Sequence, residues 1–122
     1  MAHITIKHLD GEAFREMSSI YKEEERLEYA RETLKSGGYV CVADTVLGGS
    51  LTNVLNEAYY LTNSVDYAWY ENEELLVSDE VRNVCRSTSV GDIIEINGDN
   101  YMVAGVGFSY VELEEEELGI IL

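Results

Sequence analysis

The chain has 122 residues, of which 46% are hydrophobic and 26% are charged, and this composition indicates a globular domain rather than a disordered chain. Its 24 acidic and 8 basic residues give a formal net charge of -16, which argues against direct binding to nucleic acid or to an anionic membrane surface. No apolar run approaches the roughly 20 residues of a membrane-spanning helix, and the N-terminus lacks the pattern of a secretory signal, so we expect a cytoplasmic protein.

The first third of the chain predicts a strand followed by helices. Residues 3–8 alternate apolar and polar side chains, which is the period of a half-buried strand. Asp10 is predicted to cap the helix that follows, and the serine pair at 18–19 is a point where that helix could divide into two. We expect helix from about residue 23 to residue 35, ended by the glycine pair at 37–38.

The middle of the chain predicts a strand, a helix and an irregular segment. Residues 39–46 are rich in β-branched side chains and indicate a strand, and Ser50 can cap the next helix. Residues 63–80 are polar, aromatic and acidic, so we expect them to be irregular and anchored by Trp69. One face of the predicted helix is apolar and should pack on the sheet. The residues of this face are Leu51, Val54, Leu55, Ala58, and Leu61 or Thr62.

The last third is predicted to be β-rich. Strands at 93–96 and 101–106 flank the loop Asn-Gly-Asp-Asn at 97–100, and its Asn-Gly dipeptide is typical of a tight hairpin. Glycines at 105 and 107 indicate a bend before a final strand at 108–113. The sequence therefore predicts one compact α+β domain over residues 1–122, with an antiparallel-rich sheet, a C-terminal β-hairpin and two or three packed helices.

The residue types that usually carry catalysis are scarce. Cys41 and Cys85 are the only cysteines and have apolar neighbours, so we expect reduced, buried thiols. His3 and His8 should point to opposite faces of one strand, which argues against a shared metal ion. No nucleophile motif or phosphate-binding glycine loop is present, so we expect no enzyme activity, no metal and no cofactor. An enzyme would need a cleft holding a carboxylate or cysteine with a strongly shifted pKa.

The segment RSTSVGD at 86–92 combines three hydroxyl side chains with a Gly-Asp pair. Such residues make tight, hydrogen-bonded turns, and Arg86 should form a charge-assisted contact with a nearby carboxylate. A structural turn is favoured here over a ligand site. The residues assigned to this turn are Arg86, Ser87, Ser89, Gly91 and Asp92.

A pattern running from residue 61 to residue 108 resembles a known group of proteins. It consists of Leu-Thr-Asn-Ser at 61–64, Trp69, RSTSVGD at 86–92, Tyr101 and Gly-Phe at 107–108. The pattern is similar to small uncharacterised bacteriophage proteins and to the YodL-like domain, and the resemblance covers roughly residues 39–111. It implies an α+β fold and a phage or mobile-element origin, and therefore a host cytoplasm. It implies no established activity or catalytic residues.

The negative charge is concentrated in the second part of the chain. Residues 1–50 hold nine acids and six bases, a net charge of -3, whereas residues 51–122 hold fifteen acids and two bases, a net charge of -13. Together with the phage resemblance, this predicts an acidic DNA-mimic surface that inhibits a basic, nucleic-acid-binding host defence protein, of anti-CRISPR or anti-restriction type. The candidate array is Glu71, Glu73, Glu74, Asp79, Glu80, Glu112, Glu114, Glu115, Glu116 and Glu117.

Alternatives to the mimic hypothesis remain open from the sequence. Asp92, Glu95 and Asp99 could extend the array, whereas the acids at 23–32 can pair with interleaved bases along their helix. The protein could instead be a phage accessory or regulatory module that binds a partner through aromatic residues, namely Tyr67, Trp69 and Tyr70, together with Tyr59 and Tyr60. An acidic surface can also simply be solvated. The apolar residues 118–122 could form a final core strand or a homodimer contact.

Overall fold

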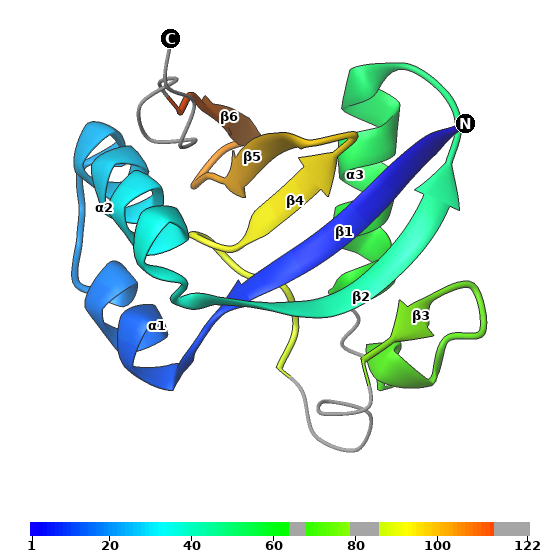
Figure 1. Cartoon of the computed structure of the whole chain (residues 1–122), viewed down its shortest axis with the longest axis horizontal. Helices are drawn as coiled ribbons and strands as arrows, with labels where there is room; N and C mark the ends of the chain where they lie inside the picture. Colours follow the sequence, from blue (N-terminus) through cyan, green and yellow to red (C-terminus); the bar gives the residue numbers. More distant parts are fainter. Residues whose placement is uncertain (64–67, 79–85, 114–122) are drawn as a thin grey trace, which may run out of the picture.

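A computed structural model of the chain describes residues 1–63, 68–78 and 86–113, and Figure 1 shows them as one α+β domain. A six-stranded sheet has the order β3-β2-β1-β4-β5-β6, and every neighbouring pair is antiparallel. The predicted fold class is therefore confirmed. In chain order the elements are β1 (Ala2–Leu9), α1 (Gly11–Ser18), α2 (Glu23–Ser36), β2 (Tyr39–Leu47), α3 (Leu51–Thr62), the 3-10 turn η1 (Trp69–Glu71), β3 (Leu76–Val77), β4 (Ile93–Ile96), β5 (Asp99–Val103) and β6 (Phe108–Val111).

The helix ends follow local signals in the sequence. The Asp10 carboxylate accepts a hydrogen bond from the N–H of Ala13 at 2.9 Å, and the Ser50 hydroxyl caps α3 in the same way. The helical region divides after Ser18, as predicted, and α2 ends at a left-handed Gly37. Within the described residues, no helix is long and apolar enough to cross a membrane.

Helices cover both faces of the sheet, as Figure 1 shows, with α3 behind the strands and α1 and α2 together at one end. Ile4 and Ile6 of β1 belong to the core beneath α3. Leu9, at the end of the same strand, belongs to a second core with Met17 of α1 and Ala30 of α2. Because successive side chains of β1 point to opposite faces of the sheet, this strand contributes residues to both cores.

A β-bulge in β2 changes which side chains of that strand are buried. Ala43 pairs with Ile6 and Cys41 pairs with Lys7, so Val42 is an extra residue on the β2 side. Val42 and Ala43 are both buried in the α3 core, although they are adjacent in sequence. Cys41 is placed on the opposite face and is exposed, so the prediction of a buried thiol was wrong for this cysteine. Cys85 lies outside the described residues.

Several boundaries differ from the predictions. Leu51 is 48% exposed, because it begins α3 directly after the exposed segment 48–50 and does not reach the sheet. Asn97 and Gly98 have φ values of 49° and 96°, as a two-residue hairpin turn requires, so β5 begins directly after them and ends at Val103. The segment predicted to be irregular contains η1 and the short edge strand β3.

Candidate functional site

The segment at 86–92 is held together by an ion pair between its first and last residues. Two nitrogens of the Arg86 guanidinium donate to the two oxygens of the Asp92 carboxylate, at 2.5 and 2.8 Å. Arg86 also donates to the carbonyl of Leu9, and its guanidinium carbon lies 3.9 Å from the centre of the Phe14 ring. The predicted charge-assisted contact of Arg86 is present, and its partner is the carboxylate of its own turn.

Asp92 also connects the turn to the first strand. Its carboxylate accepts hydrogen bonds from the N–H of Leu9 at 2.9 Å and of Ser89 at 2.8 Å, and its side chain is completely buried. Four donors therefore surround one carboxylate, which is the arrangement that makes a buried charge tolerable. Asp92 cannot extend an acidic surface, so that expectation was wrong.

Gly91 allows the turn to approach helix α1 closely. Its φ is 96°, a left-handed conformation that residues with a side chain rarely adopt. A Cβ atom added there would lie 2.5 Å from Cγ of Met17 and 3.2 Å from Cδ1 of Leu9. The Gly91 carbonyl accepts a hydrogen bond from the Tyr39 hydroxyl at 2.7 Å, and burial, followed by the Asp92 charge, raises the pKa of that tyrosine. The glycine of the motif is therefore required by packing as well as by backbone geometry.

Thr88, in the middle of the motif, links the turn to β1 and α3. Its hydroxyl lies 2.9 Å from Nε2 of His8 and donates to the Thr62 hydroxyl at 2.7 Å. Asn63 donates from its side-chain amide to the Thr88 carbonyl, and the Thr88 N–H donates to the Thr62 carbonyl. His8, Thr62 and Thr88 are all buried, so this polar chain lies inside the domain.

Trp69, in the segment that follows α3, contacts both the turn and His8. Its indole N–H donates to the Arg86 carbonyl at 2.9 Å, and its ring meets the His8 ring edge to face. The prediction that Trp69 anchors its segment is correct, because the side chain is only 1% exposed. For the same reason Trp69 cannot contact a partner, and the aromatic alternative loses that residue.

We call Arg86, Asp92, Thr88, Thr62, His8 and Trp69 the turn network. Sequence reasoning missed His8, Thr62 and Thr88, since the first two lie far from the motif in the chain. One signal was available: His8 has the same strand parity as Ile4 and Ile6 and therefore had to point into the α3 core. Arg86 is half-buried and the other members of the network are buried. Their contacts hold β1, α3 and the turn together, which is a structural role.

The buried imidazole of His8 makes stability depend on pH. Burial lowers the pKa of His8 to about 4, with Asp92 opposing this shift and Arg86 adding to it. The unfolded chain binds this proton near pH 6.5, whereas the folded chain binds it only near pH 4, so stability falls as pH drops through this interval. We expect a loss of about 3 kcal/mol between pH 7 and pH 4.

This pH dependence can be separated from that of the many carboxylates with a His8→Gln variant. Urea unfolding of the two proteins at pH 7, 5 and 4 should show a difference in free energy that shrinks towards low pH by about 3 kcal/mol. Parallel pH curves for the two proteins would mean that His8 is not held neutral in the fold.

The uncovered part of the α1/α2 face of the sheet carries a second polar group of residues. Nε2 of His3 lies 3.0 Å from the Asp44 carboxylate, which also accepts from the Thr5 hydroxyl, and Sγ of Cys41 lies 3.8 Å from the same carboxylate. Desolvation of the sulfur and the nearby Asp44 charge raise the pKa of Cys41, which lowers its nucleophilicity at neutral pH. No group of three or more His, Cys, Asp or Glu residues in the described part of the chain could hold a metal ion.

The predicted acidic array is divided between opposite edges of the sheet. Glu71, Glu73 and Glu74 are exposed beside β3, at one end of the strand order. Glu112 is exposed after β6, at the other end, and its carbonyl accepts from Arg31 of α2. Asp79, Glu80 and the four glutamates at 114–117 lie outside the described residues. The described members therefore do not form one continuous array.

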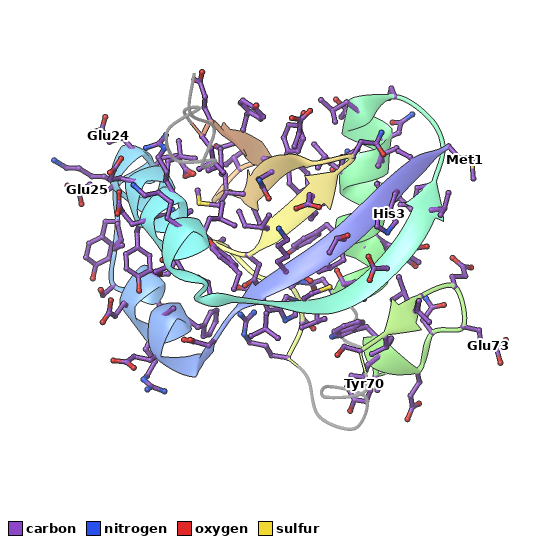
Figure 2. The ribbon with its side chains drawn as sticks, viewed as in Figure 1. Met1, His3, Glu24, Glu25, Tyr70 and Glu73 are labelled. Carbon is purple, nitrogen blue, oxygen red and sulfur yellow. The ribbon has the colours of Figure 1, made fainter. Side chains whose placement is uncertain are left out.

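The carboxylates beside β3 also differ in their partners from those on α2. On α2, Arg26, Arg31 and Lys35 each lie within 4 Å of a glutamate three residues earlier, as predicted. Beside β3, none of Glu71, Glu73 and Glu74 makes an ion pair with a described residue. Figure 2 shows Glu73 pointing away from the body of the protein at the β3 end, far from Glu24 and Glu25 on α2.

The remaining aromatic candidates are dispersed. Tyr70 is half-buried beside β3, and its ring meets that of Trp69 at a centroid distance of 5.9 Å. Tyr59 packs edge to face on Phe108, while Tyr60 is exposed on α3. Tyr67 lies outside the described residues. Tyr70 is thus the member of this set that accompanies the unpaired carboxylates.

No protein-family model, curated protein or solved structure matches this chain.

Proposed function

We propose that this protein is a phage-type inhibitor of a host defence system, of anti-CRISPR or anti-restriction type, which acts in the bacterial cytoplasm. Its acidic surface binds a basic, nucleic-acid-binding protein and excludes nucleic acid from it. The proposal is supported by the net charge of -16, by its concentration in residues 51–122, and by the resemblance to bacteriophage proteins.

The single observation that carries the proposal is the group of carboxylates beside β3 that make no ion pair with a described residue. Glu71, Glu73 and Glu74 are exposed, and residues 68–78 contain no lysine or arginine. Helix α2 instead carries three interleaved cations, each of which pairs with a glutamate three residues earlier. Carboxylates without internal partners keep their attraction for an external cationic surface, and that attraction weakens as salt increases. We therefore assign the β3 edge, rather than α2 with its interleaved cations, as the acidic surface that meets the partner.

The charge reversal of this edge is the direct test. A variant with Glu71→Lys, Glu73→Lys and Glu74→Lys changes the net charge by three times two units, from -16 to -10. A matched control with Glu24→Lys, Glu25→Lys and Glu57→Lys makes the same change at exposed helical positions. Tagged proteins are used to capture partners from bacterial lysate at low and high salt, with and without competitor DNA.

We expect wild type and the control to capture a DNA-binding protein that salt or DNA displaces, and the β3-edge variant to lose it. Expression of wild type should also restore phage growth on a host that carries the corresponding defence system. Equal loss of capture in both variants would show a dependence on net charge alone. Partners that persist at high salt and ignore DNA would contradict nucleic-acid competition.

A further inference from the structure

The β3 edge is hollowed as well as acidic. A depression of about 480 Å³ is lined by Tyr70, Glu71, Glu73, Leu75, Leu76 and Val77, among others. Leu76 is 73% exposed, and it lies beside Asp44 in the strand register. The lining of the hollow therefore combines aliphatic side chains with two carboxylates.

The strand that borders this hollow has an unpaired outer side among the described residues. β3 ends the strand order and pairs with β2 through Val77 and Leu76, and the N–H of Ser78 donates to the Val42 carbonyl of β2. Backbone groups of successive strand residues point alternately to the two sides of a strand, so those of Val77 point away from β2. An outer edge of this kind can pair with an additional strand.

The backbone of the acidic turn is anchored to the sheet. The Glu74 carbonyl accepts from the Thr45 hydroxyl of β2 at 2.9 Å, and the Glu74 N–H donates to the side chain of Asn72 at 2.9 Å. The N–H of Asn72 in turn donates to the carbonyl of the buried Trp69. The positions from which the carboxylates project are therefore set before any partner binds, which lowers the entropy lost on binding.

From these features we infer that the β3 edge binds an extended, basic peptide segment of the partner, which adds a strand alongside β3. Lysine or arginine side chains of the segment meet Glu71, Glu73 and Glu74, and an aliphatic side chain between them covers Leu76. This inference rests on the proposed function, because it names the part of the basic partner that the acidic surface recognises.

Charge complementarity selects this occupant over two others. A second copy of the chain would bring another net charge of -16 to the same edge, and nucleic acid would bring phosphates. An extended segment that carries both basic and aliphatic residues offers partners for the carboxylates and for the exposed leucine, since Glu71, Glu73 and Leu76 line the same hollow.

The test uses the full-length protein and an acetylated, amidated peptide of about eight residues in which Lys or Arg alternates with Val, a length typical of strands. Binding is measured by fluorescence anisotropy at low and high salt, and amide signals of Leu76 and Val77 are followed by NMR. Two control peptides are used: one with the same composition in block order, and one with N-methyl groups on alternate amides.

Leu76→Ala is the decisive variant, because it leaves the charge unchanged and removes a side chain that is already exposed in the free protein. We expect it to weaken peptide binding about fivefold, and the triple Glu71, Glu73 and Glu74 reversal to weaken it about 10- to 100-fold at low salt. The matched reversal of Glu24, Glu25 and Glu57 should change binding by about twofold.

Equal binding of the block-order peptide, or an unchanged affinity for Leu76→Ala, would overturn the inference. Unchanged binding of the N-methylated peptide, or unshifted Leu76 and Val77 amide signals, would rule out strand addition. These failures differ from failure of the proposed function. If DNA-sensitive capture of a host protein persists while the peptide does not bind, the inference fails and the inhibitor proposal stands.

Discussion

Replacing Asp92 by alanine is expected to lower the free energy of unfolding by about 3–5 kcal/mol, which is the usual cost of removing one partner of a buried ion pair. The substitution leaves the Arg86 guanidinium without its carboxylate, and it leaves the N–H groups of Leu9 and Ser89 without acceptors. Small domains have total stabilities of about 5–15 kcal/mol, so this one change can remove most of the stability.

The measurement is urea unfolding followed by fluorescence, for which Trp69 is the only tryptophan in the chain and lies within the network. Asp92→Asn should cost less than Asp92→Ala, because an amide oxygen can still accept from the backbone N–H groups. Asp99→Ala, at an exposed acid of the same hairpin, should stay within about 0.5 kcal/mol of wild type. Similar stabilities of the Asp92→Ala and Asp99→Ala variants would refute the structural role of the turn network.

The second large effect is expected at Trp69. Trp69→Ala should destabilise the domain by about 3–5 kcal/mol, because it removes a fully buried ring from the α3 core and leaves the Arg86 carbonyl without its donor. Trp69→Phe retains most of the buried apolar area but not the indole N–H, so it should cost about 1–2 kcal/mol beyond the change in volume.

Circular dichroism during urea unfolding measures both Trp69 variants, since neither contains a tryptophan. Tyr60→Ala is the matched control, because this aromatic residue is exposed on α3 and should change stability by less than about 0.5 kcal/mol. If Trp69→Ala unfolded like wild type and instead lost a binding partner, Trp69 would be an interface residue, as the aromatic alternative supposes.

The motif at 86–92 therefore stabilises the fold and is not assigned a role in binding or catalysis. Its turn joins β1 through Leu9 and His8, α1 through Phe14 and Met17, and α3 through Thr62. The acidic edge beside β3 differs from these contacts, since its carboxylates are exposed and make no ion pair with a described residue. Variants of the two regions can therefore be interpreted separately, the first through stability and the second through binding.

Features that depend on contacts between residues a few positions apart could be predicted from the amino-acid sequence. Asp10 and Ser50 cap helices by bonding to an N–H three residues later, and Asn97 with Gly98 forms the hairpin turn through its own backbone angles. The ion pair of Arg86 with Asp92 spans six residues and belongs to the same class. Such contacts form within one segment, so the type and order of nearby residues are enough to specify them.

Other features could not be predicted in this way, because they depend on which distant segments of the chain become neighbours in the fold. His8 meets Thr88, 80 residues away in the chain, and the bulge at Val42 reverses the alternation that would have buried Cys41. The strand order places Glu112 and Glu73 at opposite edges, although both belong to the acidic part of the sequence. Strand pairing depends on which faces of distant segments are buried together. The charge or periodicity of one segment therefore does not determine its neighbours in the sheet.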